Sequence, residues 1–263
     1  MKNRKIIILL PLSFSLVACG TNHEKELTRE EGLTKAKEIQ MAVEEDSFVL
    51  PKTCHSSYSY KTVESSTSEN QEQTTVSLKK DFFYDHDEKN PYCHWFSIVD
   101  DSKKINEGWI YVYDGKGYSV SIDIDENKTY REIAFSDVVT SITNVLKSED
   151  VDSDSVKTMS AQRINKIADE LNHENTSMKT FIKDDGTFKT SFIQDVEGYR
   201  TEMETEFKQN LITRVATKEE FTMSLSSSLP SFTYNSSLEM TFDWEKEIQH
   251  DCPNLEEFSK LLP

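Results

Sequence analysis

The alternation of hydrophobic and polar residues along the chain predicts a domain built mainly from β-strands. Apolar residues alternate with serine and aspartate over 118–125, and with charged side chains over 199–208. A period of two is typical of strands with one buried face. The segments 92–99 and 109–113 are denser apolar runs, which indicate strands covered on both faces. A turn over 114–117 follows the second of these runs.

A period near 3.6 predicts helices at the start and in the centre of the chain. A capping-box pattern opens a first helix over 28–45. Two central helices follow, and Ser136 and Ser160 are their predicted N-caps. The acidic segment 149–155 is predicted to be the loop between these two helices.

Strands return after Ser177. Segments 211–225 and 238–244 continue the alternation, and the serine-rich stretch 224–237 is predicted to be a loop between them. Residues 254–262 are predicted to close the chain with a short helix. The order is therefore helix, strands, two helices, strands. Because the spacing of βαβ units is missing, this order predicts an α+β fold in which an antiparallel β-sheet packs on helices.

The N-terminal segment has the pattern of an export signal. Three of the first five residues are basic, and an apolar run over 6–12 follows them. The segment then ends Leu16-Val17-Ala18-Cys19, which resembles the lipobox of bacterial lipoproteins. The resemblance implies export, transfer of a diacylglyceryl group to the sulfur of Cys19, and cleavage directly before that cysteine.

The apolar run is too short to cross a membrane, since a transmembrane helix needs about 20 apolar residues. The predicted organisation is a signal peptide over 1–18, a lipidated tether over 19–28 and one α+β domain over 29–263. Two acyl chains on one residue anchor a protein durably, so we expect the lipid to be the membrane attachment. The expected location is the outer side of the cell membrane, and the excess of lysine over arginine favours a Gram-positive cell surface.

The formal net charge of −17 narrows the choice of partners. The leader contributes three positive charges, so the processed chain carries −20 (−17 minus 3). Nucleic acid does not fit as a partner, because its phosphate backbone demands a basic face. A patch for anionic lipid headgroups is disfavoured for the same reason. The acidity is expected to keep the domain in solution above the membrane surface.

Besides Cys19, the chain has three cysteines: Cys54, Cys93 and Cys252. An exported domain permits disulfides. Cys54 and Cys93 each precede a histidine within a predicted strand, so the cysteines and the histidines point to opposite faces. This favours a Cys54–Cys93 disulfide over a Cys2His2 metal site, whose four ligands have to converge. Buried free thiols are the alternative, and Cys252 is either left over or pairs with one of the other two.

The order of elements resembles the half-barrel fold of bacterial lipoprotein carriers and related lipid-binding lipoproteins, the LolA/LppX type. In that fold a single curved antiparallel sheet wraps around helices and encloses an apolar cavity. The resemblance covers about residues 28–263, and it lies in the order of elements rather than in a residue motif. The aromatic segments 109–113 and 199–207 lie where such sheets have strands. A chain anchored through a cysteine does not shuttle, so the carriers' role is not implied.

The sequence offers no pattern typical of catalysis, of a metal site or of a cofactor site. Gly115 and Gly117 form a G-x-G without the third glycine of a nucleotide-binding loop. The acidic loop begins like a calcium loop, but Ser155 and Ala161 replace the required glycine and glutamate. His86 lies between two aspartates in a polar turn, where we expect exposed side chains. We therefore predict that the protein is not an enzyme and holds neither a metal nor a cofactor.

The function that the sequence favours is binding of an apolar or lipid-like ligand by an anchored, non-enzymatic protein. The predicted pocket lining is aromatic and comprises Tyr58, Tyr60, Trp109, Tyr111 and Tyr113. Aromatic residues at strand spacing also form ordinary core, which is the alternative for these five. A second class of function is a structural or interaction lipoprotein that engages an envelope protein through an exposed face.

Overall fold

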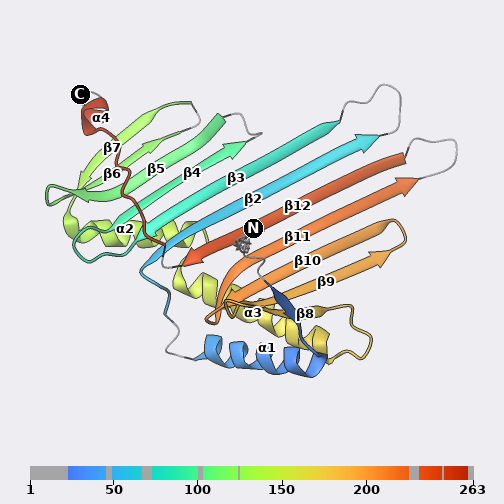
Figure 1. Ribbon diagram of the computed structural model, residues 1–263. Helices are drawn as coiled ribbons and strands as arrows, with labels where there is room; N and C mark the ends of the chain where they lie inside the picture. The colour runs from blue at the N-terminus through green and yellow to red at the C-terminus, as the bar shows by residue number, and fades with distance from the viewer. Residues whose placement is uncertain are drawn as a thin grey trace, which may run out of the picture.

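The computed structural model of the chain describes residues 23–45, 49–66, 73–99, 103–123, 125–224, 231–244 and 246–259. In this part of the chain, twelve strands form one antiparallel sheet, and the three longest helices pack on one of its faces (Figure 1). The predicted α+β class, with a curved antiparallel sheet packed on helices, is confirmed. The closer likeness to half-barrel carriers stays a prediction.

The helices and strands alternate in blocks along the chain. The helices are α1 (Arg29–Glu44), α2 (Phe135–Ser148), α3 (Ser153–Asn172) and α4 (Leu255–Ser259). The strands are β1 (Glu24–Glu26), β2 (Thr53–Ser66), β3 (Thr74–Asp85), β4 (Tyr92–Val99), β5 (Lys103–Tyr113), β6 (Lys116–Ile122), β7 (Lys128–Ile133), β8 (Lys179–Lys183), β9 (Phe188–Val196), β10 (Tyr199–Lys208), β11 (Leu211–Ser224) and β12 (Ser231–Trp244). After β1, the order is the predicted one. Part of the predicted tether is therefore structured, because β1 pairs with β8.

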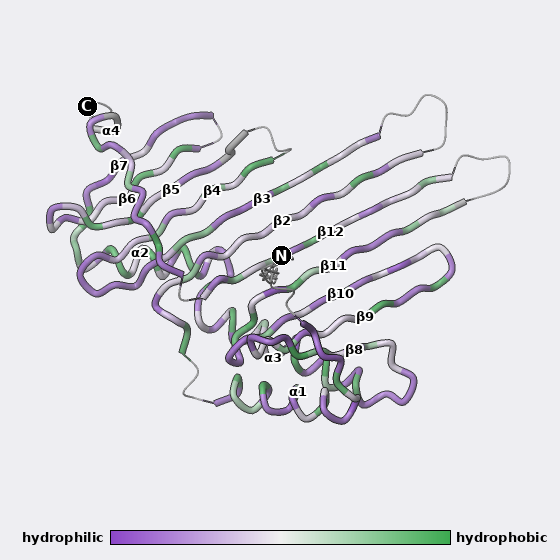
Figure 2. Tube along the Cα trace, viewed as in Figure 1, coloured by the Kyte–Doolittle hydropathy of each residue, from purple (hydrophilic) through white to green (hydrophobic). Residues whose placement is uncertain are grey.

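The sheet joins the two halves of the chain through its longest strands. The strand order is β1-β8-β9-β10-β11-β12-β2-β3-β4-β5-β6-β7, so β12 near the C-terminus pairs with β2 near the N-terminus. Along this junction Tyr58 lies opposite Met240, and Tyr60 lies opposite Leu238. Figure 2 shows how hydrophilic and hydrophobic residues alternate along the strands. This alternation gives the sheet two unlike faces.

The face that carries α1, α2 and α3, here called the helix face, holds the main hydrophobic core. Apolar residues of the three helices form one buried cluster with side chains of the sheet. The contact is close at two glycines: a Cβ on Gly32 of α1 would collide with Thr180 of β8, and one on Gly117 of β6 would collide with Val138 of α2. Glycine at these two positions therefore lets α1 and α2 lie directly on the strands.

The helices cover only one end of the long strands. Their main contacts are with β5, β6, β8 and β11, whereas the far ends of β2, β3, β11 and β12 extend well beyond them (Figure 1). Large apolar side chains at these ends and at the end of β9 are exposed: Val76 by 46%, Met223 by 40% and Val196 of β9 by 53%. Within the described ranges, the helix face thus has a packed end and an end that no helix covers.

The opposite face of the sheet, here called the outer face, is covered at one end by the C-terminal segment 246–259. Ile248 and Phe258 of this segment are buried against aromatic side chains of β4, β5 and β6. The two dense apolar runs that form β4 and β5 are therefore covered on both faces, as their composition predicts.

The helix boundaries differ from the prediction at two N-caps. The capping box at Thr28 is present. However, α2 begins two residues earlier than expected, with Ala134 rather than Ser136 at its N-cap. The N-cap of α3 is Asp152, whose side chain accepts hydrogen bonds from the backbone amides of Asp154 and Ser155. Ser160 is consequently a buried residue inside α3, and part of the predicted acidic loop is helical.

The start of β12 and the presence of β7 also differ from the prediction. The serine-rich stretch 224–237 is not a loop throughout, because β12 begins at Ser231; residues 225–230 lie outside the described part of the chain. The serines and threonines of this end of β12 pair with β11 on one side and β2 on the other. The edge strand β7 is not predicted, since few of its residues are apolar.

Candidate functional site

A hollow of about 370 Å3 opens on the helix face, at the turn between α2 and α3. Its volume lies within the range typical of small-molecule sites. Its walls come from β2, β3 and β12 and from the turn. The lining residues are Ser56, Ser57, Tyr58, Leu78, Lys80, Phe82, Ser148, Glu149, Asp150, Val151, Met240 and Phe242. Most of the sheet residues in this set are apolar, and the charged residues gather at the turn and the strand that faces it.

The turn between α2 and α3 places charged groups beside the apolar interior of the hollow. Asp150 has a φ of 56°, an uncommon conformation that reverses the chain between the helices. The preceding residue, Glu149, forms an ion pair with Lys80 of β3 at 3.1 Å. Because both side chains are partly exposed, the pair adds little stability. It does place one cation and one anion at the rim of the hollow.

The predicted aromatic lining divides between the two faces of the sheet. Tyr58 lines the hollow, and Tyr60 follows on the same face, farther from the helices. Trp109 and Tyr111 are buried in the outer-face cluster under the C-terminal segment, and Tyr113 is 61% exposed. The prediction that these five residues line one pocket is therefore wrong, because β5 turns its odd-numbered residues to the outer face.

The predicted disulfide between Cys54 and Cys93 is also wrong. Tyr84 of β3 lies opposite Cys54 of β2 on one side and opposite Cys93 of β4 on the other. The two cysteines therefore stand two strand spacings apart, about 9.6 Å, beyond the roughly 7 Å that the Cα atoms of a disulfide tolerate. All three described cysteines, Cys252 included, are free thiols.

The free thiols are poor nucleophiles. Burial raises the pKa of the Cys54 thiol and of the Cys93 thiol well above the usual range. Burial and the neighbouring Asp251 carboxylate raise the pKa of Cys252 to about 11. Since the thiolate is the reactive form of cysteine, we assign the three side chains to packing.

Rings from four neighbouring strands stack across the outer face. The ring centroids of His55 and Phe83 are 4.2 Å apart, and those of His94 and Trp109 are 4.8 Å apart; Phe83 also stacks on His94. The histidines therefore point away from the cysteines that precede them, as predicted. His55 Nε2 lies 2.9 Å from Asp81 Oδ1. Burial raises the pKa of the Asp81 carboxyl, but the hydrogen bond from His55 and a nearby lysine outweigh it, so this pKa lies below its usual range.

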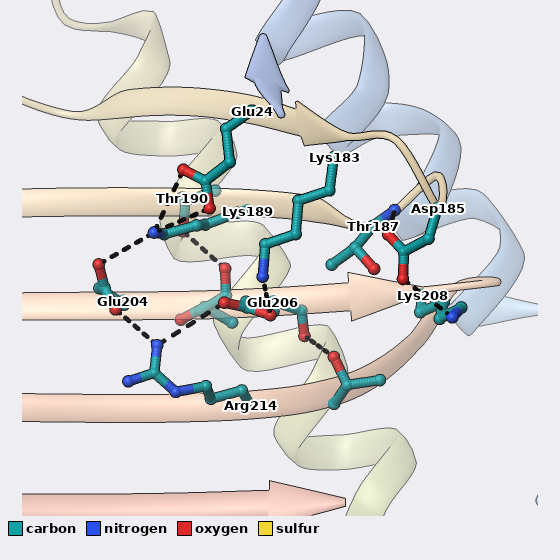
Figure 3. A network of polar contacts seen from close by, with 12 residues as sticks. Glu24, Lys183, Asp185, Thr187, Lys189, Thr190, Glu204, Glu206, Lys208 and Arg214 are labelled. Atoms are coloured by element: carbon teal, nitrogen blue, oxygen red, sulfur yellow. Dashed lines mark hydrogen bonds and ion pairs between the residues drawn. The ribbon is translucent and has the colours of Figure 1, made fainter. Parts of the chain in front are cut away.

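Charged residues of the outer face form a ladder across β1 and β8–β11 (Figure 3). Lys189 lies 3.3 Å from Glu24 and 3.4 Å from Glu204. The Arg214 guanidinium lies 2.5 Å from Glu204 and 3.6 Å from Glu206. Sequence reasoning missed this ladder, although the alternation of glutamate with threonine and methionine in β10 is its signal. Each carboxylate has a cation beside it, so the ladder ties the strands together.

The described residues contain no group of three or more His, Cys, Asp and Glu side chains placed to hold a metal ion. Within the same ranges, none of the helices combines the length and the apolar character needed to cross a membrane. Cys19 and the rest of the predicted leader lie outside the described residues. The lipobox prediction therefore rests on the sequence.

The fold and the hollow define a protein in which a curved antiparallel sheet and its helices border a small, largely apolar hollow. No family model matches the sequence, and no curated protein matches it. Among solved structures, the ywiB protein from Bacillus subtilis is 6% identical, with 74% of this chain and 94% of that chain covered and a TM-score of 0.17. A beta-barrel-like protein of a domain of unknown function from Brucella abortus is 11% identical, with 76% and 100% covered and a TM-score of 0.19. Neither score carries an argument about fold or function.

Proposed function

We propose that the protein is an extracytoplasmic lipoprotein that binds an apolar or lipid-like ligand and does not transform it. The observation that supports the proposal is the hollow of about 370 Å3 beside the α2–α3 turn. Burying an aliphatic chain against its sheet residues is worth about 25 cal/mol per Å2 of apolar surface. The Lys80–Glu149 pair at the rim supplies one polar group of each sign for the headgroup of such a ligand.

The lipid anchor predicted on Cys19 gives this binding domain its place at the outer side of the cell membrane. Only four residues lie between Cys19 and Glu24, the first residue of β1, so five Cα-to-Cα steps join the two. Five such steps of extended chain span at most about 18 Å. The anchored domain would therefore lie close to the membrane, within reach of lipids that leave it.

The alternative is a structural or interaction lipoprotein that engages a protein of the cell envelope. The observation that favours it is the uncovered end of the helix face, where Val76, Val196 and Met223 are exposed. None of these three residues lines the hollow, so the two functions are compatible with one another and are tested with different variants.

The hollow is tested by filling it. Ser56 is 8% exposed and lies between Phe82 and Phe242, so Ser56→Phe would occupy the space; Ser59→Phe, on the exposed outer face of the same strand, is the matched control. Native mass spectrometry of the chain purified from its own host should show an extra mass that extracts into organic solvent. A fluorescent fatty acid should bind the parent chain and Ser59→Phe, and should lose at least tenfold in affinity for Ser56→Phe.

Either of two results would contradict this ligand site. The first is a bare mass together with no uptake of the fatty acid probe. The second is equal binding by Ser56→Phe and Ser59→Phe, both with the thermal transition of the parent chain, since the ligand would then lie elsewhere.

The anchor is tested by Cys19→Ala. This substitution removes the sulfur that accepts the diacylglyceryl group, so the protein should stay unprocessed or be released into the medium. Membrane fractionation and intact-mass analysis distinguish the forms. A Cys19→Ala chain that is cleaved and still membrane-bound would exclude the lipoprotein assignment.

A further inference from the structure

The helix face continues past the helices as an uncovered surface, here called the distal face. It is formed by the ends of β9 to β12, β2 and β3, and it includes Val196, Tyr199, Glu219, Phe221, Met223 and Tyr234. Val196, Tyr199 and Met223 are 53%, 38% and 40% exposed. Exposed apolar patches of this kind mark binding surfaces in soluble domains.

The charge of the distal face has one sign. The strand register places Glu64 and Glu219 on it and places no lysine or arginine of the described strands there. The cations of the same strands, such as Arg200 and Lys218, alternate onto the outer face. The distal face is therefore apolar, aromatic and acidic, on a chain whose net charge is −17.

Glu219 stands in the middle of the distal face with a partner on each carboxylate oxygen. The Tyr199 hydroxyl donates to Oε1 at 3.3 Å, and the Ser236 hydroxyl donates to Oε2 at 3.3 Å. Thr201 lies directly opposite Glu219 on β10 and is 7% exposed. Its Oγ1 has no hydrogen-bond partner among the described residues. A buried hydroxyl without a partner is costly unless a ligand supplies one.

An ammonium or guanidinium group is the ligand group that fits this spot. It would meet the Glu219 carboxylate above the Thr201 side chain, and the ring of Tyr199 would provide a face for a cation–π contact. The apolar residues around it would cover the hydrophobic side of the same ligand. The site therefore fits a ligand that combines a positively charged group with an apolar surface.

We infer that the distal face docks a basic amphipathic helix of a peptide or protein partner. Six strands spaced by about 4.8 Å place the two outermost strands about 24 Å apart, and an α-helix of about 18 residues, about 27 Å long, would cross all of them. A small amphiphile would leave most of this width uncovered. A second copy of the chain would set Glu64 and Glu219 against the same acids, and like charges in an interface are unfavourable.

The test uses the chain from residue 20 to 263, which contains every described residue, and two synthetic 18-residue helical peptides. Both peptides carry the same leucine stripe; one has lysine on its polar side and the other has glutamate. Fluorescence anisotropy should detect binding of the lysine peptide and no binding of the glutamate peptide. Glu219→Gln should weaken binding roughly tenfold, as expected for removal of one partner of a desolvated charge pair. Val196→Ser should weaken it as well.

Two control variants lie next to these residues but point to the outer face. Glu220→Gln is the neighbour of Glu219, and Ile193→Ser is an exposed apolar residue of β9, like Val196; both should bind like the parent chain. Equal binding of the two peptides, or equal losses in Glu219→Gln and Glu220→Gln, would overturn the inference. So would a concentration-dependent dimer in light scattering that Val196→Ser abolishes, because the face would then belong to a second copy. Ser56→Phe should leave peptide binding unchanged, which separates this inference from the ligand site in the hollow.

Discussion

The buried hydroxyl of Tyr84 offers a sharp test of how the centre of the sheet is held together. Tyr84 is 1% exposed and lies between Cys54 and Cys93. Its hydroxyl has no hydrogen-bond partner among the described residues, and burial raises the pKa of the phenol far above its usual value. A buried polar group without a partner costs about 1–3 kcal/mol. We therefore expect Tyr84→Phe to leave the fold unchanged and to raise the free energy of unfolding by about 1 kcal/mol.

Tyr92→Phe is the matched comparison, and its expected sign is opposite. Tyr92 is equally buried, at 1% exposed, but its hydroxyl donates a hydrogen bond to the backbone oxygen of Asp251 at 3.3 Å. Removing this bond leaves a carbonyl of the C-terminal segment without its donor, which is expected to cost about 0.5–1.5 kcal/mol. The two substitutions remove the same atom from the same kind of residue, so the environment alone decides the outcome.

Urea unfolding followed by circular dichroism measures both effects in one series with the parent chain. In thermal unfolding, 1 kcal/mol corresponds to about 2–4 °C for a chain of this length. The reasoning is refuted if Tyr84→Phe loses as much stability as Tyr92→Phe, because the Tyr84 hydroxyl would then have a partner in the folded protein.

Three further predictions concern the core, the outer face and the cysteines. Phe207 is 1% exposed and pairs with Phe188 and Ile212, so Phe207→Ala should lower the free energy of unfolding by about 3–5 kcal/mol in urea titrations. Asp81→Asn should cost about 1–2 kcal/mol at pH 7. Because the folded-state pKa of Asp81 is lowered, this stabilisation is present above the unfolded pKa of about 3.9 and is lost as pH falls through the folded pKa; an undiminished gap at pH 2 would contradict it. Dithiothreitol should leave the thermal transition unchanged, because the described cysteines are free; a downward shift would reveal a disulfide.

The sequence alone was sufficient to predict the elements in which the pattern of apolar and polar residues, or a capping motif, shows which side chains are buried. The strict alternation of β10 and the capping box of Thr28 are of this kind, and both are found where the sequence predicts them. The start of β12 is different, because its serines and threonines are half-buried only through the long strands on either side. A strand defined by its neighbours carries little signal in its own composition.

The candidate site was predicted less well. Alternation within a strand shows which residues share a face, but it does not show whether that face packs on the helices or on the C-terminal segment. Tyr58 and Tyr111 each lie in a clear strand, yet one faces the helices and the other faces the C-terminal segment. Cys54 and Cys93 do share a face, as their spacing from the histidines suggests. The strand β3 lies between them along the chain, but only the order of pairing shows that it also lies between them in the sheet.

The uncovered surface, by contrast, follows from lengths alone. The strands β2, β11 and β12 have 14 residues each, which extend to about 48 Å. The longest helix, α3, has 20 residues and spans about 30 Å, and its main strand contact is with β11. Strands of this length extend beyond the helices that pack on them. Side chains on the part of a strand that no helix contacts are either polar or exposed and apolar. On the outer face those residues include the charged side chains of Arg200 and Lys218. On the helix face they are Val196, Phe221 and Met223, so the same strand ends have kept an apolar side that only binding would bury.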